Sequence, residues 1–176
     1  MGGVFAANMT GNTVLAGIAL VSLNGREAWH HLAPLIAFFA GAMLSRLLVR
    51  FTGSPRPSLA VEASVLAIVG FLPVGQEAAV VVVALAMGIQ ASAITQFART
   101  AVSTVVVTST LARTAEAALD LLWRGERQDP PAVLNRRLLV GTWVGYLAGA
   151  VAGALLLKVI AWPLLVPAGI LGLLLI

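Results

Sequence analysis

The feature that most constrains this chain is the recurrence of long apolar runs from one end to the other. Of its 176 residues, 60% are hydrophobic and only 10% are charged, and the mean hydropathy is +0.98. The 11 basic and 7 acidic side chains cannot cover the surface of an 18.2 kDa globule. This composition excludes a soluble globular domain and predicts an all-α polytopic membrane protein whose single transmembrane domain spans residues 1–176.

The apolar runs are compared with the roughly 20 residues that cross a bilayer. Three of them reach full length, and turn-forming residues separate the runs. The full-length runs occupy residues 33–50, 77–97 and 137–157, shorter or interrupted runs occupy residues 4–23, 59–74, 101–123 and 159–176, and the turns lie at residues 24–25, 52–58, 73–75 and 129–131.

Arginine placement predicts the orientation. Residues 46–56 carry three arginines and no acid, and residues 113–137 carry five arginines, so both segments are expected to be cytoplasmic. The turn at residues 73–76 has no basic residue and is expected outside. This arrangement places the C-terminus in the cytoplasm. It requires the run at 101–123 to be re-entrant, or half in the membrane and half at its surface.

An internal repeat connects the two halves. With an offset of 108 positions, the small residues Ala33, Ala37, Gly41 and Ser45 align with four glycines spaced four residues apart. A weaker match places Thr10-Gly11-Asn12 opposite residues 108–110. The charge assignment gives the halves opposite orientations, so we expect two inverted repeats, 1–74 and 75–176, of which the first lacks an opening helix. The aligned glycines, predicted to pack a helix closely, are Gly141, Gly145, Gly149 and Gly153.

Two threonine motifs interrupt the apolar runs. Irregular backbone survives inside a bilayer only where it is buried in protein or lines a cavity. Both motifs are expected to pass from extended chain into a helix, with Thr10 as the N-cap of the first. Two helix N-termini approaching each other would suit an anion or a carboxylate, although hydrogen bonding between helices explains the same residues. The predicted substrate-binding residues are Asn8, Thr10, Gly11, Asn12, Thr108, Ser109 and Thr110.

Other polar residues lie within the apolar runs. Gln90 is near the middle of its run and is predicted to line the substrate site or to form an interhelical hydrogen bond. Glu62 is the strongest intramembrane carboxylate and a candidate for proton or ion coupling, unless it extends to the nearby interface. His30 and His31 are adjacent in a predicted loop and have no partners at metal-ligand spacing.

Several functional classes lack their sequence signatures. No catalytic motif, phosphate-binding loop or metal-binding pattern is found, so an enzyme, a cofactor and a metal are not expected. The chain has no cysteine. The net charge of +4 comes from arginines at the ends of apolar runs, which indicates topology and not nucleic-acid binding.

Three strings carry a family resemblance. They are Val-Phe-Ala-Ala-Asn-Met-Thr-Gly-Asn-Thr-Val at 4–14, Ala-Met-Gly-Ile-Gln at 86–90 and Thr-Ser-Thr-Leu at 108–111. Together they resemble the bacterial YoaK family, also called domain of unknown function 1275. The resemblance implies a multi-pass inner-membrane protein without an established activity. The family usually opens with a further apolar helix containing an aspartate, and it often has glycine where Ser109 stands and asparagine where Ala91 stands.

The predicted function is transport of a small anion or carboxylate bound between the two motifs. The alternative is a non-transporting membrane scaffold or subunit that packs through the glycine helix. The expected partners are membrane lipid and a small-molecule solute, and a homo-oligomer is left open.

Overall fold

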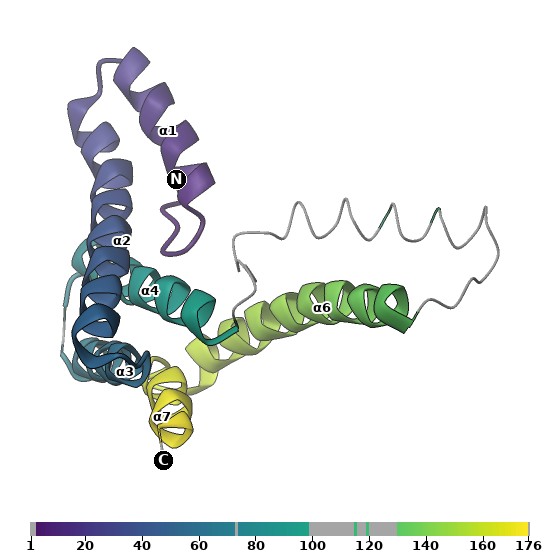
Figure 1. The fold of residues 1–176 in the computed structure, drawn as a ribbon. Coiled ribbons are helices and arrows are strands. Elements are labelled where there is room, and N and C mark those ends of the chain that lie inside the picture. The colour runs from purple at the N-terminus through teal and green to yellow at the C-terminus, as the bar shows by residue number, and fades with distance from the viewer. Residues whose placement is uncertain (1–2, 73, 99–114, 116–118, 120–129, 176) are drawn as a thin grey trace. The chain divides into compact units, whose positions relative to one another are not determined.

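The computed structural model describes residues 3–72, 74–98, 115, 119 and 130–175. Every regular element in these segments is a helix, which confirms the all-α prediction. The chain divides into two units, Met1–Ser103 with Trp162–Ile176 and Thr104–Ala161, and each is described by itself. The helices are α1 (Met9–Val21), α2 (Gly25–Thr52), α3 (Arg56–Phe71), α4 (Gln76–Ala98), α6 (Pro130–Val159) and α7 (Leu165–Leu174) (Figure 1).

Local sequence sets the helix ends. The side chain of Asn24 accepts a hydrogen bond from the Glu27 N–H at 3.2 Å and donates to the Glu27 carboxylate at 2.9 Å, which caps α2. Helix α2 ends at Gly53, whose φ of 69° is left-handed and therefore favours glycine. The turns predicted at 24–25 and 52–58 are confirmed. At 129–131 the helix begins at Pro130, where proline costs no hydrogen bond because the first helical N–H has no acceptor within the helix.

Helices α2 and α4 approach each other backbone to backbone. A Cβ atom on Gly41 would overlap the Leu85 carbonyl oxygen, and one on Gly88 would overlap the Phe38 carbonyl oxygen. The two helices run in the same direction, because His30 near the start of α2 lies against Glu77 near the start of α4. Glycine at both positions is therefore what permits this crossing.

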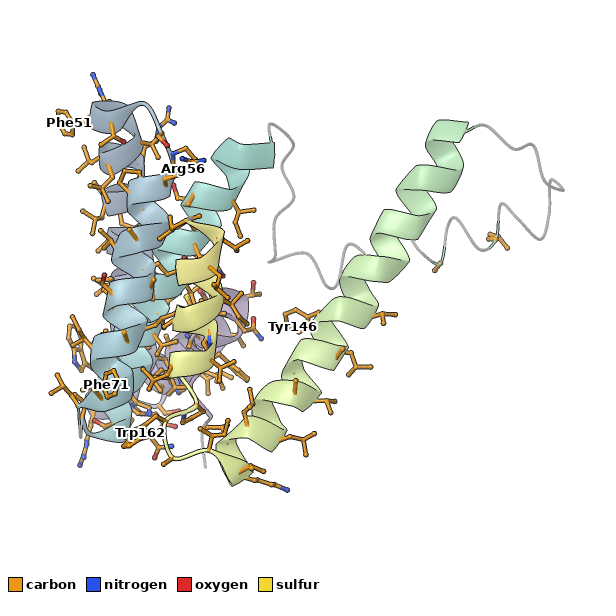
Figure 2. The ribbon with its side chains drawn as sticks, turned by 90° about the horizontal axis from the view of Figure 1, so that it is seen from below. Phe51, Arg56, Phe71, Tyr146 and Trp162 are labelled. Carbon is orange, nitrogen blue, oxygen red and sulfur yellow. The ribbon has the colours of Figure 1, made fainter. Side chains whose placement is uncertain are left out.

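Helices α3 and α7 complete the first unit. Helix α3 follows the short turn and lies at the C-terminal end of α2, next to α7; it contacts α2, α4 and α7, while α1 contacts α2 (Figure 1). Phe71 of α3 lies 6.1 Å from Trp162, ring centroid to centroid (Figure 2). The apolar core joins three helices and comprises Leu59, Leu66, Ala86, Ala93, Ala168 and Leu171.

The outer surface of the helices is apolar. Two helical segments, Gly25–Thr52 and Gln76–Ile94, are long and apolar enough to cross a membrane. Large side chains such as Ile18, Phe39 and Phe51 are exposed on the first unit. A bilayer would cover such a surface, whereas water would leave an extensive apolar patch exposed.

Candidate functional site

The first threonine motif forms the start of α1. Asn8 Oδ1 accepts a hydrogen bond from the Gly11 N–H at 3.1 Å and is the N-cap. The expectation that Thr10 caps this helix is wrong, because the helix begins at Met9 and Thr10 lies exposed in its first turn. The chain before the helix is not helical and bends at Ala6 and Ala7, whereas an extended chain was expected.

Asn12 holds the chain that precedes the helix. Its Nδ2 donates to the Phe5 carbonyl at 2.6 Å, and its Oδ1 accepts from the Phe5 N–H at 3.1 Å. The Asn12 side chain is fully buried, and Gly11 leaves room for the Phe5 ring, which would lie 3.2 Å from an added Cβ. The amides of Asn8 and Asn12 are thus engaged with the backbone of their own segment. The second motif, residues 108–110, lies outside the described residues, so the approach of the two motifs stays a prediction.

Glu62 lies deep inside the helical bundle. It is 0% exposed, and neither carboxylate oxygen has a hydrogen-bond partner among the described residues. The interpretation that this side chain extends to the interface is therefore wrong. The cause is the phase of α3: Ser58, Glu62, Leu66 and Val69 form one stripe, and that stripe faces the neighbouring helices.

Two buried serines, Ser45 and Ser58, form a polar group together with Glu62. Ser58 Oγ donates to the Ser45 main-chain carbonyl at 3.3 Å, linking α3 to α2. Ser45 Oγ is buried and has no hydrogen-bond partner within the described part of the chain. Sequence reasoning placed Ser45 in the small-residue repeat without a polar role and did not identify Ser58. The signal for Ser58 is the spacing Ser58-x3-Glu62, which places both side chains on one helix face.

Gln90 and the first threonine motif lie apart from the group formed by Glu62, Ser45 and Ser58. Gln90 is half-buried on α4, next to the fully buried Ile89. Helix α1 contacts α2, whereas α3 contacts α2, α4 and α7. Within the described segments α2 therefore separates Glu62 from Asn8–Asn12, and the structure does not bring the predicted coupling residue to the predicted solute residues.

The two histidines belong to α2 and not to a loop, which corrects the prediction for this segment. His31 is 1% exposed, and its Nδ1 has no hydrogen-bond partner among the residues described. It continues the buried stripe of α2 that includes Ala28, Pro34 and Gly41. Extending the apolar run back to the Asn24 cap would have revealed it.

A polar hollow lies where α2 and α4 begin. It has a volume of about 390 Å³, and His30 Nδ1 lies 3.7 Å from the Glu77 carboxylate across it. The starts of α2 and α4 thus meet at one end of the first unit. The residues around the hollow are Asn24, Arg26, Glu27, Trp29, His30 and Glu77.

The glycine ladder lies on α6. A Cβ atom built on any of the four glycines meets no atom of the described residues within 4 Å. The Ala37 and Gly41 face of α2, which the repeat aligns with this ladder, is covered by α4.

Comparison with known proteins places this site in a family context. The model of a family described as protein of unknown function (DUF1275) matches residues 1–176. A curated relative from Bacillus subtilis (strain 168), the UPF0700 transmembrane protein YoaK, is 31% identical over 125 residues. The match covers 64% of this chain and 55% of that relative, so the chain spans little more than half of its length. No solved structure matches.

Proposed function

The chain belongs to the DUF1275 family of membrane proteins, and on this premise we propose that it is an ion-coupled transporter of a small anion or carboxylate. Its transmembrane relative and its apolar helices support a membrane location. We assign it, also as a proposal, to the bacterial inner membrane with several crossings, inverted repeats and a cytoplasmic C-terminus.

The observation that carries the proposal is the buried carboxylate of Glu62. A buried polar group without a hydrogen bond costs about 1–3 kcal/mol, and an uncompensated charge costs more. Apolar side chains of similar volume often stabilise a protein more than buried charges do. A fully buried Glu62 without a partner among the described residues therefore contributes no evident stability to the fold. Ionisable residues in such positions line ion and proton pathways in membrane proteins.

Solute recognition is proposed at the two threonine motifs. The N-terminus of α1 carries partial positive charge, and Thr10 is exposed beside it. Asn8 and Asn12 fix the shape of this segment through the Gly11 and Phe5 backbones. An inverted repeat would bring residues 108–110 to the same depth from the other side, and Gln90 is proposed as a further solute contact.

Thermal stability of the purified protein in detergent tests the proposal. The panel contains chloride, nitrate, phosphate, acetate, lactate, succinate and glutamate, with neutral sugars for comparison. We expect one class of anion to raise Tm with concentration, and the double variant Thr10→Val with Thr108→Val to remove the response. Thr13→Val is the matched control, because Thr13 Oγ1 donates back to the Met9 carbonyl at 2.9 Å on the same helix.

Transport itself is then measured with the stabilising anion as a radiolabelled solute in proteoliposomes. Uptake that requires an ion gradient and is lost in Glu62→Gln supports the proposal. Indifference to every solute in the panel contradicts it and favours a scaffold.

The scaffold is the second candidate, and the open face of α6 supports it. No described residue lies within 4 Å of a Cβ built on any ladder glycine, which would let another backbone approach closely. Gly149→Leu would block that approach. Loss of an oligomer in this variant, together with no solute response in the parent, favours the scaffold, and an unchanged oligomer contradicts it.

A further inference from the structure

Buried side-chain oxygens gather at the junction of α2, α3 and α4. The hydrogen bond from Ser58 Oγ to the Ser45 carbonyl, 3.3 Å long, holds α3 against α2. Glu62 lies one turn along α3, about 40° around the helix from Ser58, with Cβ atoms about 5–6 Å apart. All three side chains are 0% exposed. They therefore occupy one short, enclosed stretch between the helices.

Helix α4 forms the third side of this junction. Gly41, one turn before Ser45, contacts the Leu85 carbonyl and the Ile89 main-chain nitrogen. Because α2 and α4 run in the same direction, Ser45 is level with the turn of α4 that follows Ile89. Ala93 of that turn is fully buried in the apolar core. The apolar core and the close α2–α4 crossing therefore border this junction.

The junction is rich in hydrogen-bond acceptors. An ionised Glu62 only accepts hydrogen bonds. The hydroxyl group of Ser58 already donates a hydrogen bond to the Ser45 carbonyl. The hydroxyl proton of Ser45 is uncommitted within the described segments, since Ser45 Oγ has no partner there. One neutral hydroxyl does not balance a buried negative charge. Unsatisfied buried acceptors of this kind are explained by a functional role or by a bound water or ion.

Among the described residues, the nearby cations do not supply that charge. Arg46 follows Ser45 in the chain and Arg56 precedes Ser58 by two residues, and both side chains are exposed (Arg56 is labelled in Figure 2). Helix α7 has no charged residue, and the charged residue of α4, Glu77, is acidic and lies near its start. Either a proton or a metal cation from solution would neutralise Glu62.

We propose that Glu62, Ser45 and Ser58 bind a sodium ion. A single carboxylate matches one positive charge, and the described residues contain no group of three His, Cys, Asp or Glu of the kind that divalent and transition metals prefer. The close-packed junction favours a small monovalent ion over potassium. Binding of sodium is independent of the proposed function, but its role as the coupling ion rests on that function.

The test measures Tm of the purified parent protein in detergent at fixed pH and ionic strength. Choline chloride is replaced stepwise by sodium chloride, or by potassium chloride in a parallel series. We expect sodium to raise Tm with the logarithm of its concentration once the site begins to fill, and potassium to act at higher concentrations. Glu62→Gln should abolish the rise, and Ser45→Ala or Ser58→Ala should raise the sodium Kd by about tenfold or more.

Ser64→Ala is the matched control for the two serine variants. Ser64 is on α3 as well, but it is exposed and its Oγ donates to the Ala60 carbonyl at 2.8 Å. This variant should respond to sodium like the parent. A sodium response that survives in Glu62→Gln overturns the assignment to this junction.

Two further outcomes separate this inference from the proposed function. Equal Tm values in sodium, potassium and choline, with stabilisation only as the pH falls, overturn the sodium site and leave proton-coupled transport standing. A sodium response that needs Glu62, in a protein indifferent to every solute of the anion panel, supports the sodium site and contradicts transport.

Discussion

Replacement of Gly41 by alanine tests how closely α2 and α4 pack. The added Cβ would overlap the Leu85 carbonyl oxygen and lie 3.0 Å from its carbon and 3.1 Å from the Ile89 nitrogen, whereas ordinary contacts begin at 3.4 Å. All three obstacles are main-chain atoms, so no side chain can rotate out of the way. Helix α4 must move by roughly 1 Å or bend, as in other overpacked sites.

The expected cost follows from this geometry. Overpacking typically costs about 1–3 kcal/mol, and alanine returns about 0.5–1 kcal/mol because it favours the helix over glycine. A net loss of about 1–2 kcal/mol would lower Tm by roughly 2–8 °C in a chain of this size. Gly88→Ala should behave alike, since its Cβ would overlap the Phe38 carbonyl. The double variant should cost less than the sum, because the first substitution already separates the helices.

The assay is thermal unfolding in detergent with Gly17→Ala as the control. Gly17 lies in α1, and an added Cβ there meets no atom within 4 Å. This control should keep or slightly raise the Tm of the parent. If Gly41→Ala melts at or above the temperature of Gly17→Ala, the close approach of α2 and α4 is refuted.

Three further predictions concern stability and orientation. Asn12→Ala should lower the free energy of unfolding by about 1–3 kcal/mol, because it leaves the Phe5 N–H and carbonyl unpaired; a Tm equal to the parent's would contradict this role. In sodium-free buffer Glu62→Leu should melt above the parent, because it removes a buried carboxylate without a partner among the described residues, and a lower Tm would show that the carboxylate stabilises the fold. Arg56→Cys and Arg127→Cys in this cysteine-free chain should be labelled only from the cytoplasmic side, and external labelling of both would reverse the predicted topology.

Sequence patterns predicted the end of α2 better than its start. The apolar run ended at residue 50, close to the Gly53 cap, but it began at residue 33 and left His30 and His31 in a loop, whereas α2 begins after the Asn24 cap. At the first motif, Asn8 and Thr10 are both good N-caps. The choice between them depends on which side chain reaches an N–H two or three residues ahead, and a sequence alone does not show that geometry.

The depth of Glu62 depended on tertiary packing. Its distance from the end of the apolar run allowed both a buried position and one at the interface. What decides is the phase of α3 against α2 and α4, which is set by contacts such as Ser58 with Ser45. Gly41 was predicted to be a packing residue through its match with the glycine ladder. Nothing in that match pointed to Leu85 of α4, which is the contact that the structure contains.

The helix crossing and the proposed ion site are structurally coupled. Ser45 follows Gly41 by one turn on the same buried stripe of α2, so any displacement of α4 at Gly41 also opens the junction around Ser45 and Glu62. Gly41→Ala should therefore weaken sodium binding by about tenfold as well as lower Tm, since coordinating oxygens must be held within about 0.5 Å of their productive geometry. Asn12→Ala provides the comparison, because α1 contacts α2 and has no contact with α3 in the described segments. At a similar loss of stability it should leave the sodium Kd unchanged. An equal loss of sodium affinity in both variants would show that affinity follows global stability and that the crossing does not hold the site in shape.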